Sequence, residues 1–353
     1  MSAAESSRAS EKRLPLGKLP ADLLEALLSS TPIQDERVLL GPGVGVDCAV
    51  IAFGDRALAL KSDPITFASE EIGWYAVQVN ANDIATTGAK PRWMLATLLL
   101  PEGAATPGMA QRIQAQLTAA CQEIGVDIIG GHTEITHGLD RPIVVGTMIG
   151  DVGIEQLITP RGATPGDCLL LTKGVPIEAT AILAREFPDQ LQANDPRLSF
   201  ADIQEAGNFL YHPGISVLRE AQIAVQAGAV HAMHDPTEGG LYTAAWELAK
   251  ASGCSLWIDP AMTPVPPLAR RVCTAMGVDP LGAIASGALL LAVHEQDSKK
   301  IRAALQVQGI ACALIGGVVE KSAEPVVRLG KEPSAQQLRQ VDRDEIARLY
   351  ERQ

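Results

Sequence analysis

Hydrophobic and polar positions alternate with two different periods along this chain, and the switches between them predict an α/β protein. Short apolar runs predict strands over residues 48–53 and 57–62, joined as a hairpin by Gly54-Asp55-Arg56. A helical pattern runs from Ser69 to about Thr87 and ends at Gly88-Ala89-Lys90-Pro91, because glycine followed by proline stops a helix. The other elements predicted in this half are a strand over 92–100, a helix over 107–124, and strands over 127–129 and 142–151.

A segment dense in turn-forming residues, from Thr159 to Asp167, separates this half from a second α/β pattern. The elements predicted there are strands over 168–173, 255–259, 284–293 and 313–320, and helices over 176–186, 199–207, 215–227, 241–252 and 296–308. At 353 residues, the chain is long enough for two hydrophobic cores. We therefore expect a leader over 1–35, α/β domains over 36–155 and 160–325, and a tail helix over 326–353.

Composition and charge narrow the class of partner. Acidic residues number 41 against 29 lysines and arginines, which gives a net charge of −12. Binding to a nucleic-acid backbone depends on clustered positive charge, so this balance argues against such a partner. No apolar run approaches the ~18 residues of a membrane span, and the polar stretch 1–13 lacks the apolar centre of a signal peptide. We therefore expect a cytoplasmic protein with no membrane partner.

Candidate chemistry begins with acids beside glycine-rich loops and strand ends. Asp47 follows the run Gly41 to Val46, in which Gly43 and Gly45 allow backbone N–H groups to approach a phosphate. A mobile turn is the simpler explanation of the same glycines. Asp63 stands at the exit of the second hairpin strand next to a proline, where an acid is often only a turn residue.

Two further clusters of polar residues interrupt apolar elements. Asn80 and Asp83 lie three residues apart and therefore share one face of the helix predicted from Ser69. Polar groups at mid-helix between apolar ones make both residues candidates for function. The segment Gly130-Gly131-His132-Thr133 follows a predicted strand, and nucleotides commonly bind just past the carboxyl ends of strands in α/β sheets. His132 is equally compatible with an ordinary loop histidine.

The last cluster, Asp235-Pro236-Thr237-Glu238-Gly239-Gly240, lies immediately before a predicted helix. Thr237 or Asp235 is suited to cap that helix, which is a purely structural role. The same helix N-terminus offers free N–H groups to a phosphate. Asp235 and Glu238 also suit Mg²⁺, which typically takes one or two carboxylates together with phosphate oxygens.

Taken in order, these segments resemble the motifs of the AIR synthase (PurM) superfamily, which includes the hydrogenase maturation protein HypE and thiamine-monophosphate kinase. The resemblance spans residues 36 to 322, and five motifs in the right order make it specific. The matching segments are Gly43 to Ala49, Ser62-Asp63, Val79 to Pro91, Gly130 to Thr133 and Asp235 to Leu241. The segments that look most like HypE are Asp235 to Leu241, Ala285-Ser286-Gly287 and Ile315 to Val319. The segment from Pro91-Arg92-Trp93 to Leu100-Pro101 looks more like thiamine-monophosphate kinase.

The resemblance implies a two-domain PurM-like fold and a homodimer whose N-terminal domains share a β-barrel, with ATP bound at that interface. Mg²⁺ would be bound by carboxylates, and Asp83 and Asn80 would be catalytic. The residues that match the superfamily's metal ligands are Asp47, Asp63, Asp83 and Asp235. The residues that would contact the nucleotide are Gly43, Gly45, Gly130, Gly131, His132, Thr133, Thr237 and Gly239.

From the resemblance we hypothesise an ATP- and Mg²⁺-dependent enzyme that phosphorylates a carbonyl or amide oxygen of a small substrate. Phosphate then becomes the leaving group, and Mg²⁺ offsets the charge that develops on the phosphates. Two alternatives stay open. One is a small-molecule kinase of the thiamine-monophosphate kinase type, and the other is a non-catalytic ATP-binding maturation factor with a protein partner.

The chain also departs from the superfamily's patterns. Val46 replaces the first acid of the usual Gly-Asp-Asp, and His132 replaces the acid of the Gly-Gly-Asp-Thr motif. Each replacement removes a hard oxygen ligand from the expected metal site. HypE proper ends in a Pro-Arg-x-Cys tail, whereas this chain ends at Gln353 and its last cysteine is Cys312. The substrate and the number of metal ions therefore stay open.

Overall fold

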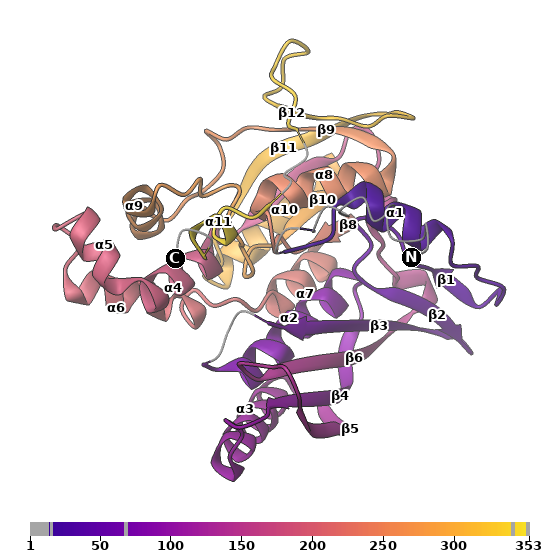
Figure 1. Cartoon of the computed structure of the whole chain (residues 1–353). Helices are drawn as coiled ribbons and strands as arrows, with labels where there is room; N and C mark the ends of the chain where they lie inside the picture. The colour runs from indigo at the N-terminus through magenta and orange to yellow at the C-terminus, as the bar shows by residue number, and fades with distance from the viewer. Residues whose placement is uncertain (1–13, 15–16, 67–69, 340–342, 351–353) are drawn as a thin grey trace, which may run out of the picture.

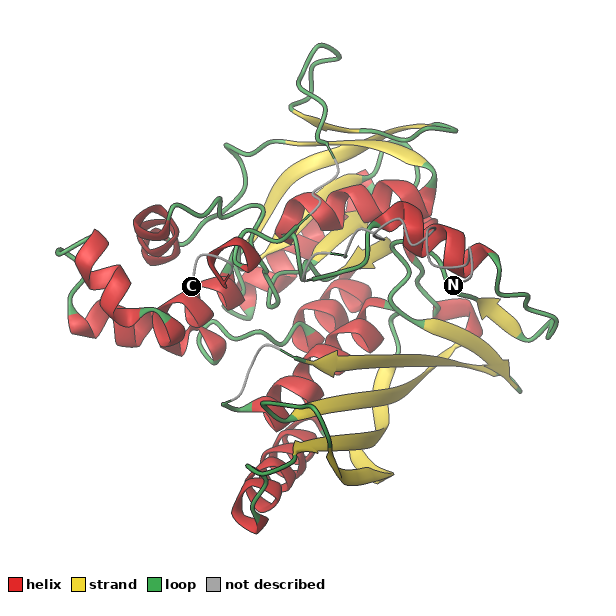
Figure 2. Ribbon diagram, viewed as in Figure 1, coloured by secondary structure: helices red, strands yellow, loops and turns green. Residues whose placement is uncertain are grey.

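Two six-stranded sheets, each with helices packed against it, form two lobes of the molecule (Figures 1 and 2). The structure is a computed structural model and describes residues 14, 17–66, 70–339 and 343–350. The arrangement confirms the mixed α/β fold with two domains that the sequence predicted. The stretch 1–13, interpreted as the start of a leader, lies outside the described residues, and α1 (Ala21–Ser29) falls within the expected leader.

The first sheet is antiparallel except for one parallel pair, β4 with β5. In spatial order its strands are β1 (Val38–Leu40), β2 (Ala49–Phe53), β3 (Arg56–Ile65), β6 (Ile143–Gly153), β4 (Lys90–Pro101) and β5 (Asp127–Thr136). The helices α2 (Ile72–Thr86) and α3 (Pro107–Ile124) cover one face, where Ile84, Leu117 and Met148 are buried in the core. Buried and half-buried residues alternate along β6, which is the pattern of a strand with one covered face.

The second sheet is covered on both faces. In spatial order its strands are β12 (Val327–Leu329), β9 (Cys254–Ile258), β11 (Cys312–Lys321), β7 (Cys168–Thr172), β10 (Leu290–Val293) and β8 (Val230–His234). Leu169 and Leu171 pack with residues of α8 (Gly240–Ser252). Leu170, between them, packs with α7 (Leu218–Ala227) and α10 (Glu295–Val307) on the other face. A continuous apolar run therefore marks this strand, because both of its faces are buried.

The remaining helices form an extension of the second lobe (Figure 1). They are α4 (Ile177–Glu186), α5 (Pro188–Asn194), α6 (Phe200–Gly207) and α9 (Pro267–Met276), with a 3₁₀ turn at Asn208–Leu210 after α6. Two other 3₁₀ turns, Ile154–Gln156 and Pro160–Gly162, lie between the two sheets in the sequence. No helix among the described residues is long and apolar enough to cross a membrane.

The predicted tail helix over 326–353 is wrong for the described part of the tail. That part contains strand β12 and a helix of only four residues, α11 (Ala347–Tyr350). The chain turns back after β12, so that Leu338 donates its backbone N–H to Val327 and packs against the second core. Ile346 is buried in the core of the helical extension. The apolar side chains of the tail thus serve two different cores and do not form one helical stripe.

Helix α2 joins the two lobes. Asn82 is fully buried on this helix, and its side-chain Nδ2 donates to the backbone oxygen of Ile215 at 2.8 Å. Its Oδ1 accepts from the backbone N–H of Val217 at 2.9 Å. One side chain therefore satisfies two buried backbone groups of the other domain, which fixes the position of α2 between the sheets.

Candidate functional site

The four acids predicted to bind metal meet where the covered face of the first sheet faces the second domain. Asp47 precedes β2, Asp63 lies on β3, Asp83 on α2, and Asp235 directly follows β8. One Nζ atom links two of them: the Lys61 ammonium lies 3.1 Å from Asp83 Oδ2 and 3.5 Å from Asp63 Oδ2. Asp47 and Asp235 lie together, with ligand atoms within 4.8 Å of one another, and the carboxylate of Asp83 adjoins that of Asp235.

Asp235 is the most deeply buried of these acids. It is 1% exposed, and neither of its carboxylate oxygens receives a hydrogen bond from any described residue. Burial, and then the nearby carboxylates of Asp83 and Asp47, raise the pKa of Asp235 well above its ordinary value. Burial, together with the carboxylates of Asp47 and Asp63, raises the pKa of Asp83 to about 7, although the positive charge of Lys61 acts to lower it. The cluster therefore carries more negative charge than the protein itself balances, and its hard oxygen atoms suit a divalent ion such as Mg²⁺.

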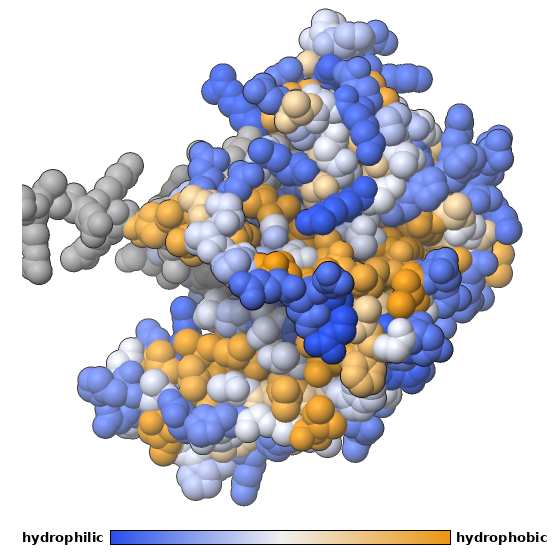
Figure 3. All heavy atoms as spheres, turned by 90° about the vertical axis from the view of Figure 1, so that its right-hand side faces the viewer, coloured by the Kyte–Doolittle hydropathy of each residue, from blue (hydrophilic) through white to orange (hydrophobic). Residues whose placement is uncertain are grey.

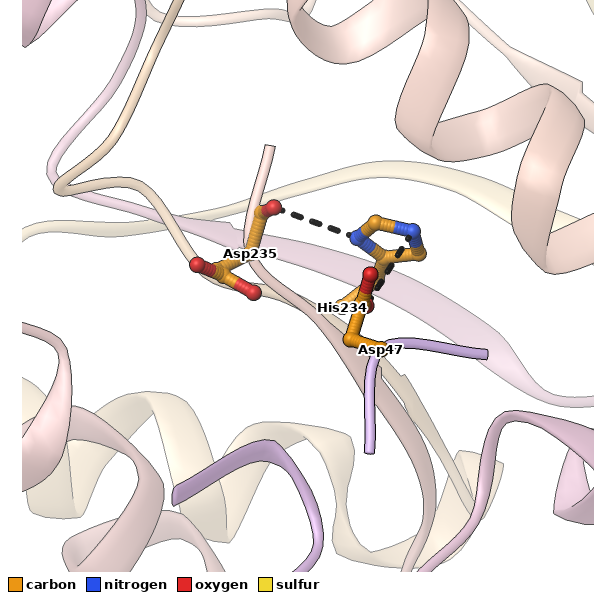
Figure 4. A group of neighbouring side chains, drawn as sticks. All are labelled: Asp47, His234 and Asp235. Atoms are coloured by element: carbon orange, nitrogen blue, oxygen red, sulfur yellow. Dashed lines mark hydrogen bonds and ion pairs between the residues drawn. The ribbon is translucent and has the colours of Figure 1, made fainter. Parts of the chain in front are cut away.

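His234 belongs to the cluster as a cation. Its Nε2 lies 3.0 Å from Glu247 Oε2 on α8 and 3.7 Å from Asp47 Oδ2. Burial by itself would lower the pKa of His234, but Asp47 and Glu247 outweigh it and raise the pKa to about 9. Figure 4 shows the Asp47 carboxylate turned toward the imidazole, whereas Asp235 meets the ring only through its backbone oxygen. As an imidazolium, His234 offsets part of the charge of Asp47, and its ring belongs with Asp47 and Asp235 to a group whose ligand atoms lie within 4.8 Å of one another.

Asn80, predicted to be catalytic, holds the backbone of Asp63 in position. Its Oδ1 accepts the backbone N–H of Asp63 at 3.1 Å, and its Nδ2 donates to the oxygen of Ala76 at 2.8 Å. It is fully buried. The amide thus ties the end of β3, and with it Asp63, to α2.

The start of α8 differs from the capping prediction. Its N-cap is Gly239, at φ 78°, and neither Thr237 nor Asp235 caps it through a side chain. A Cβ at Gly239 would lie 2.0 Å from Thr243 Oγ1, so glycine is required for this close turn. The backbone N–H of Gly239 donates to Asp344 Oδ2 of the tail at 2.6 Å. This helix N-terminus therefore already receives a carboxylate, which is the charge that such a position favours.

The glycine loop before Asp47 packs on the same helix. Gly45 has φ +73°, and a Cβ there would lie 2.5 Å from the backbone oxygen of Glu247. Gly43 accepts the backbone N–H of Val46 in the same turn. The loop therefore fixes Asp47 against α8, so that two domains supply the cluster.

Two family models match most of the chain. Residues 45–152 match AIR synthase related protein, N-terminal domain, and residues 164–328 match AIR synthase related protein, C-terminal domain. The carbamoyl dehydratase HypE of Cupriavidus necator is 30% identical over 265 residues, which cover 73% of this chain and 70% of that protein. The chain belongs to the AIR synthase related family. The resemblance to the PurM superfamily, with HypE among the relatives, is thereby confirmed.

Solved structures of this superfamily share the fold. A structure of the HypE–HypF complex aligns with a TM-score of 0.68 at 22% identity, over 92% of this chain and 100% of that chain. HypE in complex with ATP gives 0.64 at 24% identity, over 90% and 89%. The thiamine monophosphate kinase of Aquifex aeolicus gives 0.63 at 18% identity, over 87% and 94%. At these identities the likeness shows the fold alone.

The family's glycine motif at residues 130–133 lies apart from the acids within one chain. The sequence placed it in a loop after a short strand, but Gly130, Gly131, His132 and Thr133 all lie inside β5. A Cβ at Gly131 would lie 1.9 Å from the backbone oxygen of Ala96, so the glycine lets β5 pair closely with β4. Strand β5 is an edge strand, three positions from β3, or about 14 Å along the sheet.

A cavity of about 590 Å³ lies between the domains beside the cluster. Asp63 of the first domain, Glu178 and Thr237 of the second, and Asp344 of the tail are among its lining residues. Burial raises the pKa of Glu178 to about 7, and its Oε2 has no hydrogen-bond partner in the described part of the chain. The cavity therefore extends from Asp63 of the acid cluster to further buried polar groups.

Four charged residues of this site were missed by the sequence reasoning: Lys18, Lys61, His234 and Glu247. Lys61 carried a usable signal, because residues two apart on a strand share a face and Lys61 precedes Asp63 by two. His234 is adjacent to Asp235 in the sequence. Lys18, whose Nζ lies 3.6 Å from Glu247 Oε1, comes from a distant segment and carried no local signal.

Proposed function

We propose that this chain is an ATP- and Mg²⁺-dependent enzyme that phosphorylates a carbonyl or amide oxygen of a small substrate. The observation that carries the proposal is the buried carboxylate of Asp235, without a donor, beside Asp47 and Asp83. Buried carboxylates are costly unless a cation or hydrogen-bond donors offset them. Asp47, Asp63, Asp83 and Asp235 would hold Mg²⁺, which offsets the charge on the phosphates when it is bound.

The relatives support the nucleotide and the reaction class. HypE is named a carbamoyl dehydratase, and a solved HypE structure contains ATP. A phosphate oxygen would take the place of the Asp344 carboxylate at the start of α8, beside Thr237 and Gly239, and the loop with Gly43 and Gly45 would bind phosphate through its backbone N–H groups. The substrate oxygen would attack the γ-phosphorus as the bond to the bridging oxygen breaks and ADP leaves. The phosphorylated oxygen then departs as phosphate in the following step.

This chain's own residues would hold the reacting groups in place. Asn80 fixes Asp63 through its backbone N–H, and His234 fixes Asp47. The cavity between the domains would receive the substrate, and its buried lining would exclude water from the transfer step. Asp83, which we expect to be catalytic, lies at the centre of the cluster in contact with Lys61.

We also propose a homodimer formed through the first domain. Several large apolar side chains are exposed on the uncovered side of its sheet or along its edge strand β5: Trp93, Leu95, Ile129 and Ile135. Figure 3 shows apolar residues gathered on the lower lobe, which is this domain. A second copy would cover them and pair with the free edge of β5. The motif from Gly130 to Thr133 would then reach a nucleotide across the interface.

A protein partner is supported by one relative, since HypE has been solved in complex with HypF. Two other functions are distinguishable from ours by experiment: a thiamine-monophosphate kinase-like reaction and ATP binding without turnover. The cytoplasmic location stays a prediction.

The test is ADP release by the full chain with Mg²⁺ and ATP over a panel of primary amides, an S-carbamoylcysteine peptide and thiamine monophosphate. We expect an amide to stimulate ADP release and Asp235→Asn to reduce it at least ~100-fold, on the scale of lost transition-state stabilisation. Asp189→Asn, on the exposed start of α5, is the matched control and should leave the rate unchanged. Phosphorylated thiamine monophosphate would establish the kinase, and ATP binding without ADP release over the whole panel would establish the non-catalytic factor. Absence of ATP binding would refute the proposal.

A further inference from the structure

One cation of the acidic cluster is part of the protein. Lys61 lies on β3 with its side chain 13% exposed, and its Nζ contacts the carboxylates of Asp63 and Asp83 from the two elements that face each other there. Residues two apart on a strand point to the same face, so β3 itself directs Lys61 and Asp63 toward α2. The side chain of Asp83, on α2, is 4% exposed. This ammonium is therefore held between two carboxylates by the fold.

An ammonium in this position competes with a divalent ion. Mg²⁺ binds carboxylate oxygens at about 2.0–2.1 Å and demands near-ideal octahedral geometry. The Lys61 Nζ lies 3.1 Å and 3.5 Å from oxygens of Asp83 and Asp63, in the space that an ion bridging these two carboxylates would need. A lysine ammonium is a compact point charge, so it can offset the pair without supplying ligands. The pair is thus already partly neutralised.

Asp235, by contrast, has no ion pair with Lys61 or with any other cation of the described residues. Neither oxygen of Asp235 receives a hydrogen bond among the described residues, and it lies beside Asp47 within 4.8 Å. Resting on the function proposed above, we infer that Lys61 replaces one divalent ion of the site. Of the four acids assigned to Mg²⁺ above, only Asp47 and Asp235 then bind the single divalent ion of each protomer directly, and Asp63 and Asp83 keep the lysine as their counter-ion.

The experiment counts Mn²⁺ bound to the full chain, with the metal alone and no nucleotide, by equilibrium dialysis and electron paramagnetic resonance. We expect one tight Mn²⁺ per protomer in the wild type. Lys61→Met removes the ammonium at nearly constant side-chain length, so Asp63 and Asp83 become free to bind a second ion. The count should double to two, with a spin-coupled pair in the spectrum. Lys299→Met, at an exposed position on α10, is the matched control and should bind one.

Two further variants keep the test decisive if Lys61→Met does not fold. Lys61→Arg preserves the charge and should bind one Mn²⁺, and Lys61→Met with Asp63→Asn restores the charge balance and should also bind one. Two ions in the wild type, one ion in folded Lys61→Met, two in either further variant, or none in the wild type would overturn the inference. Failure of ATP turnover with the expected counts would overturn only the proposed reaction, whereas turnover with two ions in the wild type would overturn only the role of Lys61.

Discussion

The two sheets have the same number of described strands, but they differ in how far the rest of the chain covers them. All four residues of β10, in the second sheet, are buried, and helices cover both faces around it. In the first sheet, most residues of the edge strand β5 are exposed, and the covering helices α2 and α3 lie on one face only. The second sheet is therefore completed by its own chain, whereas the first presents an apolar face and a free edge.

This difference explains where the candidate site lies. The covered side of the first sheet faces the second domain through α2, and the acids of the cluster come from that side and from the end of β8. The second domain supplies a platform, a sheet that is buried on both faces, and the first supplies a sheet with one open face. Breaking the platform should unfold the chain, while changing the open face should alter association and leave the fold intact.

The largest expected effect follows from the platform. Leu170 is fully buried at the centre of the second sheet, where β7 pairs with β10 and β11. Leu170→Ala should lower the free energy of unfolding by about 2–5 kcal/mol, the sum of lost transfer energy and a residual cavity. Urea unfolding followed by circular dichroism measures this change. The same substitution at Leu95, 37% exposed on the open face, is the matched control, and an equal loss in a monomeric sample would contradict the comparison.

The junction between the domains should give the next effect. Asn82→Ala leaves the backbone N–H of Val217 and the oxygen of Ile215 buried without their partners. Each unsatisfied group costs about 1–3 kcal/mol, so we expect a loss of about 2 kcal/mol or more on unfolding in urea. Asn82→Asp retains the acceptor for Val217 and removes the donor. An unchanged midpoint for both variants would show that α2 does not depend on the second domain.

Elements with strong local patterns were predicted well from the sequence. The hairpin of β2 and β3 and the helices α2 and α3 lie within a few residues of their predicted limits. The periodicity of apolar residues and the glycines at the ends of elements are local signals, and they were sufficient to predict these elements. The short strand β8 was missed, because its sequence from Val230 to His234 includes two histidines, which interrupt the apolar run expected of a buried strand.

The acids of the site could be predicted from the sequence because they lie in motifs that occur in a recognisable order. The charged residues that pair with them could not be predicted in this way. Asp47, Asp63, Asp83 and Asp235 lie in one cluster, and their role as metal ligands stays a prediction. Glu247 forms ion pairs with His234, more than ten residues away in the sequence, and with Lys18, more than two hundred residues away. No local sequence pattern predicts contacts over such separations. Gly130 and Gly131 were placed in a loop because glycine usually ends a strand, whereas here they allow close pairing with β4.

The pH dependence of the stability of the metal-free protein tests the burial of Asp83 between the two domains. Asp83 loses its proton near pH 4 in the unfolded chain and at about pH 7 in the folded one. Between these values the folded state binds more protons, so its contribution to stability falls as the pH rises from 4 to 7. We expect Asp83→Asn to reduce this loss by about 1 kcal/mol or more, on the scale of one pKa unit. Urea unfolding of both proteins at pH 5 and pH 7.5, with a chelator present, measures this change in stability. A larger stabilising contribution of Asp83 at pH 7.5 than at pH 5 would contradict the prediction.

The smallest effect on the free energy of unfolding is expected on the open face, and it is the most informative about the dimer. Ile135 is 67% exposed on β5, so Ile135→Asp should change the stability of the monomer by no more than about 0.5 kcal/mol. If a second copy covers this edge, the buried charge should convert a dimer into a monomer in light scattering. Val307→Asp introduces the same charge at an exposed position of α10 and should leave the mass unchanged. A dimer that persists in Ile135→Asp would show that copies associate through another surface, because an unpaired carboxylate buried in an apolar contact costs more than such a contact contributes.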